Sequence, residues 1–146
     1  PLGSAKFVVV WQSTLQDGAE DGIFLQRFGA NGKDGMELQV NQYIQGNQAN
    51  PDVAPLPGGG FVVVWESSAQ EVSGSGIWMR RYKADGNPVG DEVQVNLFID
   101  ANQSKPRVAS FPDGSVVVVY QTDIMDASGT AIGARRIAPD GSSIYR

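Results

Sequence analysis

The chain has 146 residues, of which 41% are hydrophobic, and its formal net charge is −5. It contains no cysteine and no histidine, which excludes disulfides, thiolate chemistry and the usual histidine general base or metal ligand. The negative charge, without a lysine- or arginine-rich cluster, argues against nucleic-acid binding, and no apolar run approaches the roughly 18 residues of a membrane span, so we expect no membrane insertion.

The chain begins with Pro1-Leu2-Gly3-Ser4, which resembles the remnant of an expression tag, so we expect the repeat domain to occupy residues 5–146. An apolar run of β-branched and aromatic residues follows. It occurs three times, at intervals of 54 and 55 residues, at positions 7–11, 61–65 and 116–120. The sequence therefore predicts a tandem repeat with units at about 7–50, 51–105 and 106–146.

Each of the three apolar runs has the composition of a β-strand and is too short for a typical helix. Apolar and polar residues do not alternate within it, so both faces of the strand must be covered. A radial stack of sheets covers both faces of its inner strands, whereas a two-sheet sandwich leaves one face of every strand in water.

The first run leads to a second predicted strand at 23–28, a turn at Ala30-Asn31-Gly32 and an alternating strand at 37–41. Asn and Gly accept the positive φ of a tight hairpin turn. A link then reaches the predicted strand at 51–56, which turns into the second apolar run. The later repeats contain the same parts, and the last strand is predicted at 143–145.

Each complete unit thus has four short strands in about 50 residues, which is typical of a β-propeller blade. We predict an all-β fold of propeller-like blades, each of four antiparallel strands, with about two and three-quarter blades in an incomplete ring. A β-sandwich or an open stack of sheets is the alternative that this pattern allows. Because an incomplete ring leaves uncovered faces, we expect self-association through blade edges.

Several motifs of the second repeat are shared with a known type of repeat. They are Gly-Ile-x-x-x-Arg from Gly76 to Arg81, the stretch 84–96, and Asn102-Gln103 before a Pro-x-Val-Ala segment. They resemble repeats found in many copies in large secreted bacterial proteins that are linked to hemolysin-type calcium-binding repeats and adhesins. The resemblance implies an extracellular or cell-surface protein with propeller-like blades and associated calcium (Ca2+). The family's turn often carries an Asp two residues before Asp-Gly, whereas this chain has Gly29, Lys83 and Ala138 there.

Trp78 is a candidate ligand-binding residue because its equivalents in the other repeats are Phe24 and Gly133. Packing therefore does not require an aromatic side chain at this position. A partly exposed Trp78 beside Arg80 suits stacking on a carbohydrate or contact with a protein, and an ordinary surface residue is the alternative.

An acidic loop follows the first apolar run and contains Asp17, Glu20 and Asp21. Carboxylates are the oxygen ligands that Ca2+ prefers, so these three residues are a candidate cation site. The alternative interpretation is a solvated acidic loop without a bound ion.

Three arginines, Arg27, Arg81 and Arg136, recur at one position of the repeat, and Glu37 and Glu92 recur in the following strand. One interpretation is a ring of charges that faces a ligand. The interpretation we favour is structural, with each arginine forming an ion pair or binding backbone carbonyl groups between neighbouring strands.

The functional prediction is a non-enzymatic structural or adhesive module of a larger secreted or cell-surface protein, which contacts glycans or surface proteins. We predict no enzyme because near-identical repeats place the same residues in every blade, whereas a catalytic centre needs different residues that converge. The alternative is a carbohydrate-binding or carbohydrate-cleaving propeller, in which paired carboxylates would perform glycoside hydrolysis.

Overall fold

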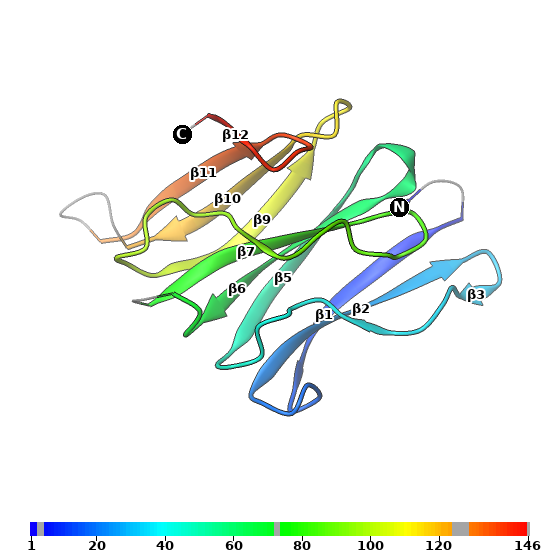
Figure 1. Cartoon of the computed structure of the whole chain (residues 1–146), viewed down its shortest axis with the longest axis horizontal. Helices are drawn as coiled ribbons and strands as arrows, with labels where there is room; N and C mark the ends of the chain where they lie inside the picture. The colour runs from blue at the N-terminus through cyan, green and yellow to red at the C-terminus, as the bar shows by residue number, and fades with distance from the viewer. Residues whose placement is uncertain (3–4, 72–73, 124–128, 146) are drawn as a thin grey trace.

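The computed structural model describes residues 1–2, 5–71, 74–123 and 129–145. In this part of the chain the strands form three antiparallel sheets of four strands each, which we call blades (Figure 1). The first blade contains β1 (Phe7–Thr14), β2 (Asp21–Gly29), β3 (Gly32–Lys33) and β4 (Leu38–Gln39). The second contains β5 (Gln48–Pro55), β6 (Phe61–Ser68), β7 (Ser75–Tyr82) and β8 (Val93–Gln94). The third contains β9 (Gln103–Ser110), β10 (Val116–Thr122), β11 (Ala131–Ile137) and β12 (Ser143–Tyr145).

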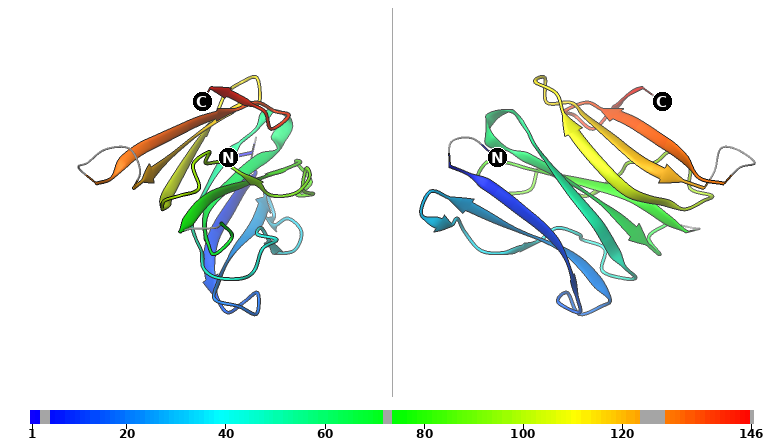
Figure 2. Two further views of the ribbon diagram at one scale, coloured as in Figure 1. Left: turned by 60° about the vertical axis from the view of Figure 1, so that its left-hand side comes forward. Right: turned by 180° about the vertical axis from the view of Figure 1, so that it is seen from behind.

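The strands of the second and third blades pair in chain order, β5-β6-β7-β8 and β9-β10-β11-β12. We call β5 and β9 the inner strands, because each packs on the blade before it: β5 contacts β1 and β2, and β9 contacts β5, β6 and β7. Figure 2 shows the three sheets stacked side by side rather than as two facing layers. This arrangement confirms the predicted propeller-like blades of four antiparallel strands.

The first blade has no inner strand in the described part of the chain. Its strand β1 corresponds to β6 and β10, but among the described residues it pairs only with β2. The structure also adds β3, a strand that the sequence did not predict. It forms because the hairpin turn after β2 continues the ladder, with Gly29 opposite Gly32 and Phe28 opposite Lys33.

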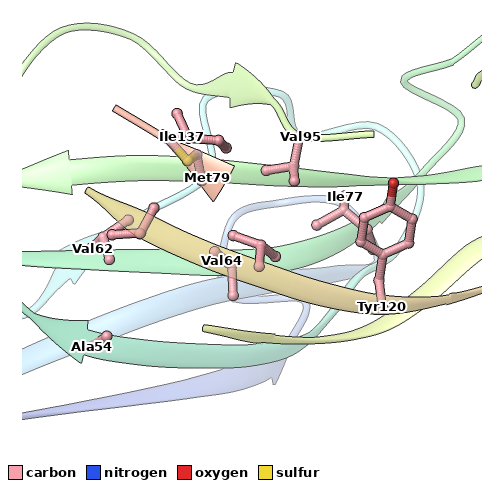
Figure 3. Close-up of a cluster of buried hydrophobic side chains, with 10 residues drawn as sticks. Ala54, Val62, Val64, Ile77, Met79, Val95, Tyr120 and Ile137 are labelled. Carbon is pink, nitrogen blue, oxygen red and sulfur yellow. The ribbon is translucent and has the colours of Figure 1, made fainter. Parts of the chain in front are cut away.

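The central strand β6 is buried on both faces, as its unbroken apolar run predicted. Phe61, Val63 and Trp65 face the first blade, and Val62 and Val64 face the third. All five side chains are 0% exposed. Figure 3 shows the cluster around Val62 and Val64, which joins the second and third blades. The fold is therefore held together by apolar layers between the blades. Alternate residues of β6 contribute to the layer on each side of the second blade.

The predicted turn residues form tight turns. Gly86 has a φ of 86°, which glycine adopts without the steric cost that a side chain brings. The Oδ1 atom of Asp85 accepts a hydrogen bond of 2.9 Å from the backbone N–H of Asn87. This hydrogen bond is the main reason that the pKa of Asp85 lies below its ordinary value. Asp140 bonds the N–H of Ser142 in the same way in the third blade.

Three sequence predictions include residues that the structure does not describe. Residues 3–4 belong to the predicted tag remnant, residues 72–73 to the predicted second repeat, and residues 124–128 and 146 to the predicted third repeat. Leu2, which lies in that remnant, packs against the cluster between the first and second blades. Among the described residues, no helix has both the length and the apolar character needed to cross a membrane.

Candidate functional site

The third blade departs from the other two at one pair of facing residues. The register pairs aromatic residues in the first two blades, Trp11 with Phe24 and Trp65 with Trp78, but Tyr120 with Gly133 in the third. The ring of Tyr120 lies over Gly133, where a Cβ atom would be 2.5 Å from Tyr120 Cε2. The third blade therefore lacks one of the two aromatic side chains that fill this place elsewhere.

A hollow of about 190 Å³ lies beside this pair, and we call it the Gly133 hollow. The link after β8 forms one wall, and strands of the third blade form the rest. Its lining residues are Leu97, Phe98, Gln103, Tyr120, Thr122, Ile132, Gly133, Ala134 and Arg135. Phe98 and Ile132 are 56% and 70% exposed, so the hollow is bordered by apolar side chains that water can reach.

Gln103 contributes a buried amide to the hollow and is only 1% exposed. Its Oε1 atom accepts a hydrogen bond of 2.8 Å from Asn96 Nδ2. Its Nε2 atom has no hydrogen-bond partner among the described residues. The equivalent Gln48 of the second blade instead donates to the carbonyl oxygens of Gln45 and Gly46. A buried N–H donor without a partner in the described part of the chain thus belongs to a residue that lines the hollow.

Two further polar groups border the hollow. Burial raises the pKa of Tyr120, so its hydroxyl group is neutral at neutral pH and can both donate and accept a hydrogen bond. Arg135 is held by the blade interface, because its Nη1 atom donates to the carbonyl oxygen of Val95 at 2.6 Å. The hollow therefore combines an apolar surface with an amide, a phenol and a fixed guanidinium group.

The structure places Trp78 and Arg80 between the first and second blades. Trp78 is half-buried and packs against the apolar cluster there, and its Nε1 atom is buried without a partner in the described part of the chain. Arg80 donates from Nη1 to Val40 O at 3.3 Å and from Nε to Gly90 O at 3.2 Å. Both side chains thus have structural contacts, and ligand binding by them stays a prediction.

The acidic residues of the loop after β1 do not converge. The Oδ2 atom of Asp17 lies 3.3 Å from Gln39 Nε2 and 3.4 Å from Asn41 Nδ2, whereas Asp21 accepts a hydrogen bond from Gln12. No group of three or more acidic side chains that could hold a metal ion occurs among the described residues. The structure therefore does not bring Asp17, Glu20 and Asp21 together as ligands of one ion.

The sequence contained one signal for the Gly133 hollow that we interpreted differently. The variation between Phe24, Trp78 and Gly133 directed attention to Trp78, where the large side chain is present. The structure shows that the glycine is the informative member of the set, because the Tyr120 ring lies over it and the hollow opens beside this pair. The sequence marked Gln103 only as part of the recurring Asn102-Gln103 motif, because the unbonded state of its Nε2 atom depends on the surrounding fold.

No protein-family model matches the sequence, and no curated protein matches it. Among solved structures, the chain is similar to a Hadza microbial sialidase, with a TM-score of 0.65 and 14% identity over 96% of this chain and 34% of the sialidase. It is also similar to an endo-arabinase from Bacteroides thetaiotaomicron, with a TM-score of 0.54 and 12% identity over 86% of this chain and 50% of the arabinase. The chain thus spans about a third of the sialidase and about half of the arabinase.

These two matches contradict the prediction that the chain is not an enzyme. Both matched proteins are named as enzymes, and both are similar to this chain in fold. The prediction assumed that repeated blades cannot build a catalytic centre. That assumption is wrong for this fold, because loops that differ between similar blades can supply different residues to one site.

Proposed function

We propose that the chain is a segment of a carbohydrate-active β-propeller and that the Gly133 hollow binds a sugar ring. The observation that carries this proposal is the combination of an apolar hollow with the free, buried Nε2 donor of Gln103. Sugar rings present C–H groups that pack on apolar and aromatic side chains, together with hydroxyl groups that need hydrogen-bond partners. The sialidase and arabinase likeness supports a carbohydrate ligand at the level of the fold.

The size of the hollow limits the ligand to one ring. Pockets for drug-sized molecules usually measure about 300–1,000 Å³. The Gly133 hollow measures about 190 Å³. We therefore expect it to hold a single sugar unit, either free or at one end of a longer glycan, while Phe98 and Ile132 contact the next unit at the rim.

The role of the hollow itself is binding rather than bond cleavage. Glycoside hydrolysis commonly uses two carboxyl groups on opposite sides of the scissile bond. None of the nine residues that line the hollow is acidic. In a carbohydrate-cleaving protein the carboxyl groups would come from other residues, and the hollow would position the substrate. An extracellular or cell-surface location and an adhesin-type role stay predictions from the sequence resemblance.

A sugar-binding screen of the unaltered chain, repeated with a variant that blocks the hollow, tests the proposal. We expect sialic acid, arabinose or oligosaccharides of either kind to bind, as measured by ligand-observed NMR and calorimetry, and chromogenic glycosides to report any cleavage. The variant Gly133→Phe puts a side chain where a Cβ atom would lie 2.5 Å from Tyr120 Cε2, so it must displace the Tyr120 ring that borders the hollow and should abolish binding. Met36→Phe, at a residue 82% exposed and outside the hollow, is the control and should leave binding unchanged.

Two results would contradict the proposal. One is the absence of binding to every sugar in the screen. The other is binding that Gly133→Phe leaves intact in a variant whose thermal unfolding matches that of the unaltered chain. Tyr120→Phe and Gln103→Leu then separate the two polar contacts, because each removes one hydrogen-bonding group from the hollow.

A further inference from the structure

Strand β1 has a free edge at the place where the other blades have an inner strand. β6 pairs with β5 and β7, and β10 pairs with β9 and β11, whereas β1 pairs only with β2 in the part of the chain that the structure describes. A free strand edge presents main-chain N–H and C=O groups to which another extended segment can add. The first blade thus lacks, among the described residues, the inner strand that the other two blades have.

The side chains beside this edge are exposed, unlike their equivalents. Val9 is 42% exposed, whereas Val63 and Val118, which hold the same position in β6 and β10, are 0% exposed. Val63 lies opposite Val53 of β5, and Val118 lies opposite Val108 of β9. Val9 therefore lacks both the facing valine of an inner strand and the packing against a preceding blade that buries Val63 and Val118.

The two inner strands share a sequence and a backbone shape. Both have the pattern Gln-x-x-Pro-x-Val-Ala, from Gln48 in β5 and from Gln103 in β9. In both, the residue before the proline has a positive φ, 52° at Asn50 and 51° at Lys105, and the register shifts there. One pattern therefore specifies a bulged strand that fits beside the Val-rich strand of a blade.

We propose that the free edge of β1 binds an extended segment with the pattern Gln-x-x-Pro-x-Val-Ala from another repeat of this type, by antiparallel strand addition. The pairing in the second blade fixes the register, with the valine of the segment opposite Val9 and its alanine opposite Val8. A second folded copy of this chain does not offer such a segment, since its β5 and β9 are already paired. This proposal is independent of sugar binding.

A synthetic peptide tests this proposal directly. A fluorescein-labelled peptide with the sequence of residues 101–112 contains the β9 pattern and should bind the chain saturably, as measured by fluorescence anisotropy. A matched peptide with Val108→Asp and Ala109→Asp should bind at least about tenfold more weakly, because it loses the apolar contacts of the strand. No saturable binding at peptide concentrations up to about 1 mM would overturn the proposal.

Two variants of the chain locate the binding edge. Val9→Asp places a charge opposite the valine of the peptide and should weaken binding about tenfold or more. Val119→Asp makes the same change in β10, at a residue that is 37% exposed and already has a paired strand on each side, and should leave binding unchanged. Both sites are exposed, and thermal unfolding by circular dichroism checks that both variants fold. Equal weakening by the two changes would overturn the assignment to β1.

Two further experiments test whether main-chain N–H groups of the peptide bond β1 and whether the β1 edges of two chains pair with each other. Successive N–H groups of a strand point to opposite edges, so methylating the peptide nitrogens of both Val108 and Ala109 must remove a bond to β1. This peptide should lose binding, and retained binding would exclude strand addition. If light scattering instead shows a dimer of the chain that Val9→Asp converts to a monomer, two β1 edges pair with each other and the proposal fails.

Discussion

The guanidinium group of Arg81 extends from the second blade to the third, where Nη2 donates a hydrogen bond of 3.1 Å to the carbonyl oxygen of Ala138. Its Nη1 atom donates to Gly114 O at 3.0 Å. Arg27 makes the same connection from the first blade to the second, with a hydrogen bond of 2.9 Å to Ala84 O. Arg27 and Arg81 therefore join neighbouring blades through backbone carbonyl groups, whereas Arg136 forms an ion pair with Asp113 of its own blade. These contacts are of the kinds that the structural interpretation of the repeat predicted.

Removing this connection should destabilise the chain. We expect Arg81→Met to lower the free energy of unfolding by about 2 kcal/mol, because hydrogen bonds from a charged donor are lost while the aliphatic part of the side chain is kept. Urea unfolding followed by circular dichroism measures the change. Arg107→Met is the control, since Arg107 is exposed and its Nη1 atom donates to the carbonyl oxygen of the neighbouring Pro106 in the same strand. Equal losses in the two variants would contradict a role for Arg81 between blades.

The position of a valine in the stack of blades should decide how much it contributes to stability. Val63 and Val9 hold the same place in the repeat, but Val63 is 0% exposed and Val9 is 42% exposed. We expect Val63→Ala to cost about 2 kcal/mol, because it removes buried carbon atoms and leaves a cavity. Val9→Ala should cost less than about 0.5 kcal/mol. Denaturant unfolding of both variants tests this, and similar losses would show that β1 is covered in solution.

The sequence predicted the blades because the information for them is local and repeated. The run at Phe61–Trp65 shows its strand character in five consecutive residues, and the turn at Asp85-Gly86 marks where the chain reverses. Repetition at nearly constant spacing then indicates that the same sheet is built again. The unpredicted strand β3 has only two residues, Gly32 and Lys33, too few to carry a strand pattern.

The candidate site could not be predicted in the same way, because it depends on contacts between blades. The importance of Gly133 arises from Tyr120 opposite it and from Phe98 on the preceding blade. Likewise, the sequence predicted a partly exposed Trp78 but did not show that this side chain packs against the cluster between the first and second blades. Burial and spare hydrogen-bonding capacity are properties of the packed structure, and a repeat pattern does not specify them.

The bulge of β9 stores backbone strain that a substitution should relieve. Lys105 has a φ of 51°, in the left-handed region, where a side chain clashes with the backbone. Asn50 occupies the same place in β5, and asparagine tolerates this region better than lysine does. We expect Lys105→Asn to raise the free energy of unfolding by about 0.5–1 kcal/mol, measured by urea unfolding. Lys83→Asn, in a residue with no such backbone strain, should give no comparable gain.

Ionisation of buried tyrosines should destabilise the chain at high pH. Tyr82 is 3% exposed and stacks on Phe61 with ring centroids 4.9 Å apart. Burial raises the pKa of Tyr82 to about 12, above the ordinary value of 10.0. Because the folded-state pKa is the higher one, the contribution of this group to stability is complete below about pH 10 and is lost as the pH rises towards about 12.

A pH series of unfolding measurements checks this prediction. The difference in pKa corresponds to at most about 2–3 kcal/mol of stability lost between about pH 10 and 12. Tyr82→Phe cannot ionise, so its free energy of unfolding should fall less steeply over this range, although Tyr120, whose pKa burial also raises, leaves a residual slope. The control Tyr43→Phe removes a hydroxyl group that bonds Ala69 O and should keep the full alkaline loss. A Tyr82→Phe variant with an unchanged slope would show that Tyr82 does not titrate as a buried group.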